Sequence, residues 1–533
     1  MLLGYSIVNG EALKASQGSF KGFDPATCTT LEPDFHYASV DDLNRAADLA
    51  DEAFGAYSKL SGKERGKFLR HIAAGIEAIA DELVARANKE TALPEARLKG
   101  ELGRTTGQLR LFAQVIEEGS WVNARIDPAM PERQPLPRAD LRAMLRPLGP
   151  VAVFGSSNFP LAFSVAGGDT ASALAGGNPV IVKAHSAHPG TSELVGQVIS
   201  KSAKACGLPA GVFSLLFGAG TSVGMALVKH PKIKAVGFTG SETAGRALMD
   251  ACASRPEPIP CFTEMSSVNP VFVLPEALKT RGAQIAAGLF GSFTLGVGQF
   301  CTKPGLVFLP ENAEADALVA ELKTHVEKAP CAPLLTEGIA KSYHSGIADR
   351  VGKANVETVV TAAKPADLKK TYAIPVVFQI KGSEFLSDHS LAGEIFGPTT
   401  VVIRYKDNKE LVQLVSALHG QLTATLHGTE SDIAAAADLI SALERKAGRL
   451  VLNGFPTGVE VCHAMVHGGP YPATADSRFT SVGTMAIYRF ARPVCFQDFP
   501  QAALPEELKD GNPLGIMRLV NGVQTRDAVG AKV

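Results

Sequence analysis

The chain has 533 residues, of which 46% are hydrophobic, and its 52 basic residues nearly balance its 53 acidic ones. This length exceeds what one hydrophobic core can organise, so we expect two or three domains. The balanced charge gives no field for attracting a nucleic acid or an anionic membrane, which favours a small-molecule substrate.

The N-terminus and the cysteines predict a cytoplasmic protein. Residues 1–10 lack the basic region of a signal peptide. The most apolar stretch, residues 161–177, is interrupted by Asp169 and four glycines, so no membrane span is expected. The eight cysteines are then expected to be reduced thiols rather than disulfides.

The first 120 residues are predicted to be mostly helical. Ser61 opens the sequence Ser-Gly-Lys-Glu, which has the spacing of a capping box, and Ser39 is a second candidate cap. Apolar residues at 72, 76, 79 and 83 then recur on one helix face. Residues 127–150 hold six prolines and are predicted to form an extended arm.

From residue 151 to about residue 253 the chain has the alternation of a parallel βαβ sheet. Short apolar runs at 151–154, 180–183, 212–217 and 235–238 are separated by helix-like stretches. The usual glycine-rich dinucleotide fingerprint is absent after the first run. Gly240, Ser241 and Gly245 follow the last run and open a helix, so they are candidate phosphate-binding residues. An ordinary tight turn is the alternative.

Cys301 is the candidate nucleophile, because it lies in Gly-Val-Gly-Gln-Phe-Cys-Thr, where a predicted helix runs into a loop. Glu264, 37 positions earlier, is a possible general base. Lys183 ends an apolar run, where a lysine can reach a ligand in the crevice of a parallel sheet. The alternatives are a buried structural cysteine and a surface lysine.

A series of segments in chain order resembles the aldehyde dehydrogenase superfamily, over nearly the whole chain. They are Gly-Pro-Val-Ala-Val-Phe (149–154), Ser-Asn-Phe-Pro (157–160), Val-Lys-Ala (182–184), Phe-Thr-Gly-Ser (238–241), Thr-Glu-Met (263–265), Gly-Gln-Phe-Cys (298–301) and Gly-Glu-Ile-Phe-Gly-Pro (393–398). The resemblance implies an α/β fold with three parts. These are a Rossmann-type cofactor domain (1–126 and 147–262), an α/β catalytic domain (263–452), and a β oligomerisation arm with a C-terminal tail (127–146 and 453–533).

The resemblance also implies roles for three residues. Cys301 attacks the aldehyde as a thiolate, and the amide of Asn158 with the backbone N–H of Cys301 stabilises the oxyanion. Glu264 activates the water that hydrolyses the thioester, provided that partial burial raises its pKa. Relatives that pass the acyl group to coenzyme A lack this glutamate, so a carboxylic acid is the expected product.

NADP is the favoured cofactor, with NAD as the alternative. By resemblance Lys183 holds the adenosine ribose, while Glu394 and Phe396 contact the nicotinamide ribose and ring. NAD-preferring relatives have a glutamate where this chain has Ser186. A carboxylate repels a 2′-phosphate, whereas a serine can donate a hydrogen bond to it.

The details of residues 157–172, 183–191 and 467–474 are similar to the branch that contains α-ketoglutaric semialdehyde dehydrogenases and the NADP-linked fatty aldehyde dehydrogenase of luminous bacteria. We favour 2,5-dioxopentanoate as substrate, with Arg104 and Arg110 as candidates for binding its carboxylate. Phe159 and Phe163 are predicted to line the tunnel and suit medium or long aliphatic aldehydes equally well. Solvated helix arginines are the alternative for both arginines.

The C-terminal region holds a possible metal site and a possible interface strand. Cys462, His463 and His467 lie near one another in sequence, but no metal is expected there, because a fourth ligand is lacking. Thr484–Phe490 is predicted to be a strand that pairs across a subunit boundary in a homodimer or homotetramer. A non-catalytic nucleotide-binding protein with the same fold is the alternative function.

Overall fold

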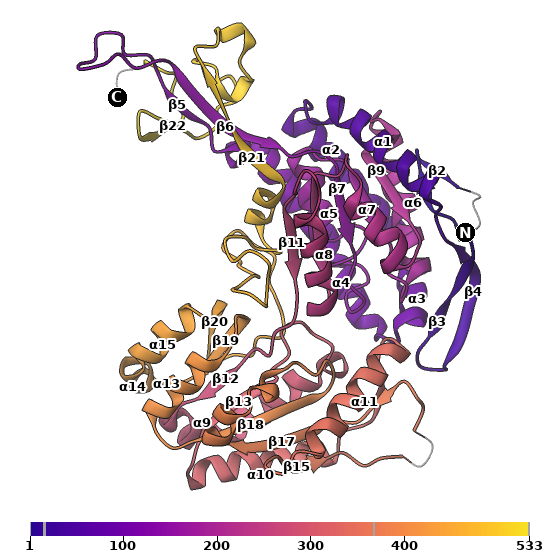
Figure 1. Ribbon diagram of the computed structural model, residues 1–533, viewed down its shortest axis with the longest axis vertical. Helices are drawn as coiled ribbons and strands as arrows, with labels where there is room; N and C mark the ends of the chain where they lie inside the picture. The colour runs from indigo at the N-terminus through magenta and orange to yellow at the C-terminus, as the bar shows by residue number, and fades with distance from the viewer. Residues whose placement is uncertain (1, 14–16, 366–367, 531–533) are drawn as a thin grey trace.

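The computed structural model describes residues 2–13, 17–365 and 368–530, which form two α/β lobes and a projecting β arm (Figure 1). Each lobe is built on a seven-stranded sheet, and a five-stranded sheet forms the arm. No helix among the described residues has the length and apolar character needed to cross a lipid bilayer. The architecture agrees with the fold class expected from the sequence.

The first lobe contains the predicted parallel sheet, in the order β11-β10-β7-β8-β9-β1-β2. Its strands are β1 (Ile7–Val8), β2 (Glu11–Ala12), β7 (Val151–Phe154), β8 (Val180–Lys183), β9 (Phe213–Leu216), β10 (Ala235–Thr239) and β11 (Cys261–Glu264). β7 and β8 begin and end at the predicted residues, because both faces of a parallel sheet are covered and every residue of the two strands except Lys183 is apolar. β11 continues through Glu264, two residues beyond the predicted domain boundary.

Helices cover both faces of this sheet. They are α1 (Val40–Tyr57), α2 (Gly62–Ala78), α3 (Ala80–Thr91), α4 (Glu95–Glu118), α5 (Gly168–Gly176), α6 (Pro189–Ala205), α7 (Met225–Lys229) and α8 (Glu242–Ala253). Capping boxes at Ser39 and Ser61 begin α1 and α2, as the sequence predicts. Among the described residues, however, helix starts only at residue 40. The prediction that the first 120 residues are mostly helical is wrong for residues 7–36, whose described part has strands and turns but no helix.

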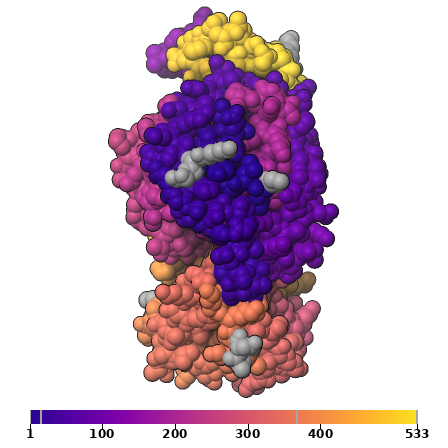
Figure 2. Space-filling model, turned by 90° about the vertical axis from the view of Figure 1, so that its right-hand side faces the viewer, coloured from indigo at the N-terminus to yellow at the C-terminus, as the bar shows by residue number. Residues whose placement is uncertain are grey.

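Two of these N-terminal strands, β3 (Ser19–Asp24) and β4 (Thr29–His36), form a hairpin that reaches the other lobe. At its tip the carbonyl of Pro25 accepts a hydrogen bond from Thr371 Oγ1 at 2.7 Å, and the carbonyl of Ala26 accepts one from Lys369 Nζ at 2.8 Å. Figure 2 shows this indigo segment running down onto the orange lobe. The N-terminal hairpin therefore bridges the two lobes.

The second lobe has a sheet in the order β15-β17-β18-β13-β12-β19-β20, parallel except for β15. Its strands are β12 (Val271–Val273), β13 (Leu306–Pro310), β15 (Glu357–Thr361), β17 (Val376–Lys381), β18 (Thr399–Tyr405), β19 (Gln421–His427) and β20 (Ala447–Leu452). The helices are α9 (Pro275–Thr294), α10 (Ala313–Glu327), α11 (Glu337–Val351), α12 (Gly382–Ser387), α13 (Asn408–Ala417), α14 (Glu430–Ala435) and α15 (Ala437–Glu444). β14 (Ala332–Pro333) and β16 (Tyr372–Ala373) form a small separate ladder.

The arm sheet has the order β21-β6-β5-β22-β23 and projects from the first lobe (Figure 1). Its strands are β5 (Arg125–Asp127), β6 (Leu141–Pro147), β21 (Ala491–Gln497), β22 (Arg518–Val520) and β23 (Val523–Thr525). The prediction that Thr484–Phe490 is a strand is wrong. This segment is a 3-10 helix, η6, that packs on α5 and buries Ala486, Ile487 and Phe490. The strand that pairs with β6 is the next segment.

Candidate active site

Cys301 lies in a tight turn that follows α9. After this helix ends at Thr294, Gly296, Val297 and Gly298 have φ values of 57°, 59° and 67°. A left-handed conformation is rare for a β-branched residue such as Val297, and rare backbone conformations are concentrated at functional sites. A Cβ on Gly298 would lie 2.3 Å from the Gly397 carbonyl, so only glycine allows these two loops to touch.

Buried amides hold the nucleophile's backbone in place. Asn269 Nδ2 donates to the carbonyl of Cys301 at 2.8 Å and to that of Lys303 at 3.1 Å. Asn269 is in turn held by Thr423 of β19, whose hydroxyl donates to Asn269 Oδ1 at 3.0 Å. The turn that carries Cys301 is therefore fixed to the second lobe.

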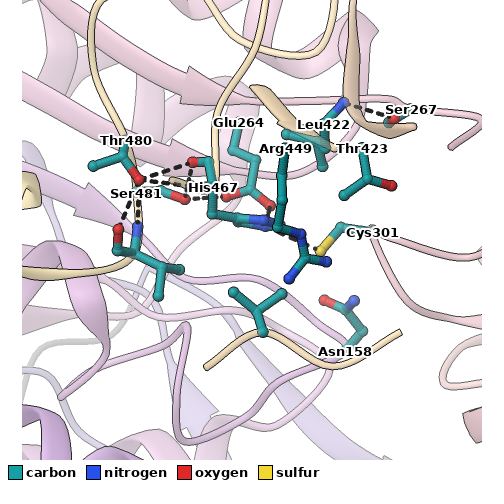
Figure 3. A network of polar contacts seen from close by, with 12 residues as sticks. Asn158, Glu264, Ser267, Cys301, Leu422, Thr423, Arg449, His467, Thr480 and Ser481 are labelled. Carbon is teal, nitrogen blue, oxygen red and sulfur yellow. Dashed lines mark hydrogen bonds and ion pairs between the residues drawn. The ribbon is translucent and has the colours of Figure 1, made fainter. Parts of the chain in front are cut away.

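Glu264 reaches Cys301 from the end of β11, and His467 lies between them (Figure 3). His467 Nε2 lies 2.9 Å from Glu264 Oε1 and 3.4 Å from Cys301 Sγ. The second carboxylate oxygen of Glu264 accepts a hydrogen bond from the Ser481 hydroxyl. The thiol, imidazole and carboxylate thus form one hydrogen-bonded group, to which each lobe and the C-terminal loop contribute one residue.

The contacts of His467 place a proton on Nε2. An ionised carboxylate only accepts hydrogen bonds, so Nε2 must carry a proton when it faces Glu264 as an anion. The same Nε2–H can therefore be donated to Glu264 or, after ionisation, to the sulfur of Cys301.

The surroundings move the pKa values of both reacting groups. Burial and the neighbouring Glu264 charge raise the pKa of Cys301 well above its usual value, so the resting group is a thiol. Burial also favours a raised pKa for Glu264, but the charge of His467 and hydrogen bonds from His467, Ser481 and Cys301 outweigh it, and the pKa is lowered. The expectation that burial raises the pKa of Glu264 is therefore wrong.

Asn158 lies on the loop that follows β7 and is 7% exposed. The side-chain Nδ2 of Asn158 donates to the backbone carbonyl of Gln299 at 3.0 Å. The backbone carbonyl of Asn158 accepts a hydrogen bond from Arg97 at 2.7 Å. Figure 3 shows its amide group facing Cys301 from below. An amide nitrogen has two N–H groups, so one remains to face a carbonyl oxygen bound at the sulfur.

Aromatic rings covered by guanidinium groups form the wall beside this loop. Phe159 and Phe163 are joined by one helical turn, with Phe163 N donating to Phe159 O, and their ring centroids are 5.3 Å apart. Arg97 stacks at 5.0 Å from the Phe159 centroid, and Arg104 at 5.4 Å from that of Phe163. Phe163 is also 6.3 Å from the His467 ring, so this wall reaches the catalytic group.

The structure separates the two arginines that the sequence offered for a substrate carboxylate. Arg104 donates to Val459 O at 2.5 Å, and its Nε and Nη2 are buried without a partner among the described residues. Arg110 pairs instead with Glu77 at 2.5 Å on the outer surface, where both side chains are about 40% exposed. Only Arg104 lies at the site.

The predicted cofactor residues of the first lobe lie at the carboxyl edge of its sheet. Lys183 ends β8 and Ser186 follows it, and Gly240, Ser241 and Gly245 follow β10, so the two groups lie on either side of β7. Ser241 caps α8 through its side chain. Ligands of open α/β sheets bind at this edge.

Lys183 is the residue that tests whether this edge fits a cofactor. Burial lowers its pKa to about 8, and no carboxylate within the described ranges pairs with it. Such an amine is satisfied by ribose hydroxyls or a phosphate, so the edge fits NAD(P), with Ser186 exposed beside it.

Glu394 and Phe396 come from the second lobe, on the loop before β18. Burial raises the pKa of Glu394 to about 7, and its carboxyl group accepts hydrogen bonds from Ser266 and Ser267. The ammonium of Lys303 holds this loop by donating to Ile395 O and Thr399 O at 3.0 Å each. The loop would thus face a nicotinamide ribose placed between the lobes.

Sequence reasoning missed His467 as a partner of the nucleophile. The sequence placed His467 beside Cys462 and His463 as a possible metal ligand. In the structure His463 points elsewhere, since its ring lies 3.3 Å from Thr484 Oγ1. The donor atoms of Glu264, Cys301 and His467 lie within 4.8 Å of one another. No local pattern could have shown this, because His467 is 166 positions from Cys301.

Comparisons with known proteins agree with this geometry. The aldehyde dehydrogenase family profile matches residues 13–472. The chain is 50% identical to alpha-ketoglutaric semialdehyde dehydrogenase 2 of Azospirillum brasilense, over 98% of this chain and 99% of that protein. It is 47% identical to the alpha-ketoglutaric semialdehyde dehydrogenase of Acinetobacter baylyi, with the same coverage.

Solved structures show the same fold at lower identity. Lactaldehyde dehydrogenase from Escherichia coli superimposes with a TM-score of 0.80 at 20% identity, covering 92% of this chain and 98% of that one. A 3,6-anhydro-L-galactose dehydrogenase gives 0.79 at 21% identity, covering 92% and 99%. The chain belongs to the aldehyde dehydrogenase family and oxidises an aldehyde to a carboxylic acid with NAD(P).

Proposed function

We propose that this enzyme oxidises 2,5-dioxopentanoate to 2-oxoglutarate and prefers NADP to NAD. The observation that carries the substrate assignment is Arg104, a largely buried guanidinium beside Cys301 whose Nε and Nη2 have no partner in the described parts of the chain. A carboxylate is the ligand that satisfies such a group best. The names of the two relatives at 47–50% identity support the same substrate.

In the first half of the reaction Cys301 becomes the nucleophile. Glu264 takes the thiol proton, and the Nε2–H of His467 then donates to the thiolate. Attack on the aldehyde carbon creates an oxyanion, which accepts hydrogen bonds from the Asn158 amide and the backbone N–H of Cys301. The bound cofactor supplies the acceptor for the hydride that leaves this carbon.

In the second half Glu264, having released the proton of the thiol to solvent, takes one from water, and the resulting hydroxide attacks the thioester. The carboxylic acid leaves, and the proton held by Glu264 returns to the sulfur of Cys301, which restores the resting thiol. The low pKa of Glu264 keeps it ionised at neutral pH, so it is ready to act as a base.

The fatty-aldehyde alternative fits the wall less well. A long alkyl chain would have to cover Arg97 and Arg104, which stack on the two phenylalanines, and would leave their buried N–H groups without partners. An unsatisfied buried donor costs about 1–3 kcal/mol, and more when it is charged. We therefore expect short, anionic aldehydes to be preferred.

Initial rates with three aldehydes test the substrate. We expect kcat/KM for 2,5-dioxopentanoate to exceed that for pentanal or decanal by at least about 30-fold. This factor corresponds to the free energy of one charge-assisted hydrogen bond, about 2 kcal/mol. Reduced cofactor is followed by absorbance at saturating NADP. A preference for decanal would contradict the substrate assignment and favour the fatty-aldehyde alternative.

Replacing Glu264 with glutamine tests its role as the base for hydrolysis. The steady-state kcat should fall about 10³-fold, since general bases contribute about 10²–10⁴. Loss of the Glu264 charge removes one cause of the raised pKa of Cys301, so thiolate formation remains possible. We therefore expect a burst of about one reduced cofactor per site in stopped-flow measurements. Glu276→Gln on the surface of α9 is the control; a variant that turns over normally would refute the role.

Replacing Ser186 with glutamate tests the cofactor preference. A carboxylate at this exposed position beside Lys183 would repel a 2′-phosphate and accept hydrogen bonds from ribose hydroxyls. The ratio of kcat/KM for NADP to that for NAD should fall at least about tenfold, the effect of about 1.4 kcal/mol. Ser186→Ala should lower the same ratio less. An unchanged ratio in Ser186→Glu would place the 2′-phosphate elsewhere.

The arm supports a homodimer or homotetramer as part of this proposal. Its sheet projects from the body, and β20, the edge strand of the second lobe, leaves Leu450 36% and Leu452 55% exposed. Exposed apolar edge strands favour pairing with another chain. Sedimentation velocity measures the assembly directly.

A further inference from the structure

We infer that Arg449 of β20 joins Arg104 in a two-arginine site that binds the distal carboxylate of the substrate. This inference rests on the proposed function and names the group on the enzyme that would select an anionic aldehyde. Arg449 belongs to the second lobe, whereas Arg104 belongs to α4 of the first. A bound carboxylate would therefore connect the two lobes.

The sheet places Arg449 close to the nucleophile. It lies opposite Thr423 in the parallel pairing of β19 and β20, and Thr423 is hydrogen-bonded to Asn269, which holds the carbonyl of Cys301. Figure 3 shows the Arg449 side chain running toward Cys301 and ending above Asn158. Strand β20 thus directs a positive charge at the reaction centre.

The two arginines hold the same loop. Arg449 donates to Pro456 O at 2.7 Å and to Gly458 O at 3.1 Å, while Arg104 donates to the next carbonyl, that of Val459. The loop of residues 456–459 therefore ties the two guanidinium groups to one short segment of the chain.

Both guanidinium groups retain unused donors. Nε of Arg449, and Nε and Nη2 of Arg104, are buried without a partner in the parts of the chain that the structure describes. Two buried acids lie nearby. Glu264 accepts a hydrogen bond from His467, and Oε1 of Glu101 accepts the backbone N–H groups of Leu161 and Ala162, while its Oε2 has no partner among the described residues. Neither acid forms an ion pair with Arg104 or Arg449 in the described parts of the chain, and the carboxylate of a ligand matches the free donors in charge and geometry.

The substrate chemistry suits this arrangement. 2,5-Dioxopentanoate carries its aldehyde at one end and a 2-oxo acid at the other, so a carboxylate held by the arginines leaves the aldehyde free to reach Cys301. Loss of the one charge-assisted hydrogen bond that Nε of Arg449 would donate corresponds to a reduction in affinity of about 30-fold. An uncharged aldehyde of equal length, such as pentanal, would not use these contacts.

The test compares Arg449→Met with wild type on 2,5-dioxopentanoate and pentanal. We expect KM for 2,5-dioxopentanoate to rise about 30-fold, with kcat/KM for pentanal changed less than about threefold. Arg449→Lys keeps the charge and should recover part of the preference. Arg445→Met, on the exposed end of α15, is the matched control. Equal losses on both aldehydes would mean that Arg449 only supports the 456–459 loop and would overturn the inference.

A second experiment separates this inference from the proposed substrate. Inhibition of pentanal oxidation by 2-oxoglutarate reports anion binding without turnover, and its inhibition constant should rise at least about tenfold in Arg449→Met. If wild type prefers pentanal but this inhibition depends on Arg449, the carboxylate site stands and the substrate assignment falls. If wild type prefers 2,5-dioxopentanoate and Arg449→Met alters neither measurement, the site is refuted and the substrate assignment stands.

Discussion

Replacing Cys301 with alanine should lower kcat for aldehyde oxidation by at least about 10⁴-fold, because removing a nucleophile leaves only binding and oxyanion stabilisation. The small side chain leaves the turn intact, since Asn269 contacts the backbone carbonyl of residue 301 and not its side chain. Cofactor reduction at saturating aldehyde measures the effect. Cys462→Ala in the C-terminal loop is the control and should retain activity.

Alkylation of the wild-type thiol provides an independent check of the same group. Because the pKa of Cys301 is raised well above its usual value, only a small fraction is thiolate at pH 7. Between pH 7 and pH 9 the rate of reaction with iodoacetamide should therefore increase about tenfold per pH unit. A rate that is already constant across this range would contradict a raised pKa.

Replacing His467 with phenylalanine should reduce kcat/KM about 100-fold and move the acidic limb of the pH profile to higher pH. His467 supplies the charge and hydrogen bond that lower the pKa of Glu264 against the opposing effect of burial. Without His467, burial dominates and the pKa rises, so Glu264 is protonated over a wider range and the base is lost at a higher pH.

The profile of kcat/KM between pH 5 and pH 10 separates this effect from misfolding, which would lower the rate at every pH without moving the limb. His467→Gln retains an N–H donor toward Glu264 and should restore part of the shift. His463→Phe, at an exposed neighbouring position, is the control. An acidic limb that stays in place in His467→Phe would refute the proposed coupling.

The sequence predicted elements well where local chemistry determines structure. β7 and β8 are short runs that are buried except at Lys183, and the capping boxes at Ser39 and Ser61 depend on residues three positions apart. The choice of both Arg104 and Arg110 for one carboxylate site was an error that a helical wheel would have revealed. Six residues correspond to about 240° of helix rotation, so the two side chains cannot face the same site.

Features that depend on distant contacts were less accessible. η6 was mistaken for a strand, because seven residues are too few to distinguish a period of two from a period of three. His467 joins Glu264 and Cys301 only after both lobes and the C-terminal loop have assembled. The hairpin of β3 and β4 depends on a docking surface near Thr371 that is more than 300 positions away.

That hairpin limits how the enzyme can open. The chain already crosses between the lobes after β11 and again after β20, and the hairpin adds a noncovalent strap made by residues of the first lobe on the second. A hinge motion on that side must break the contacts to Pro25 and Ala26. Unfolding of one lobe would also release the strap from the other, so the two lobes should melt as a single cooperative unit.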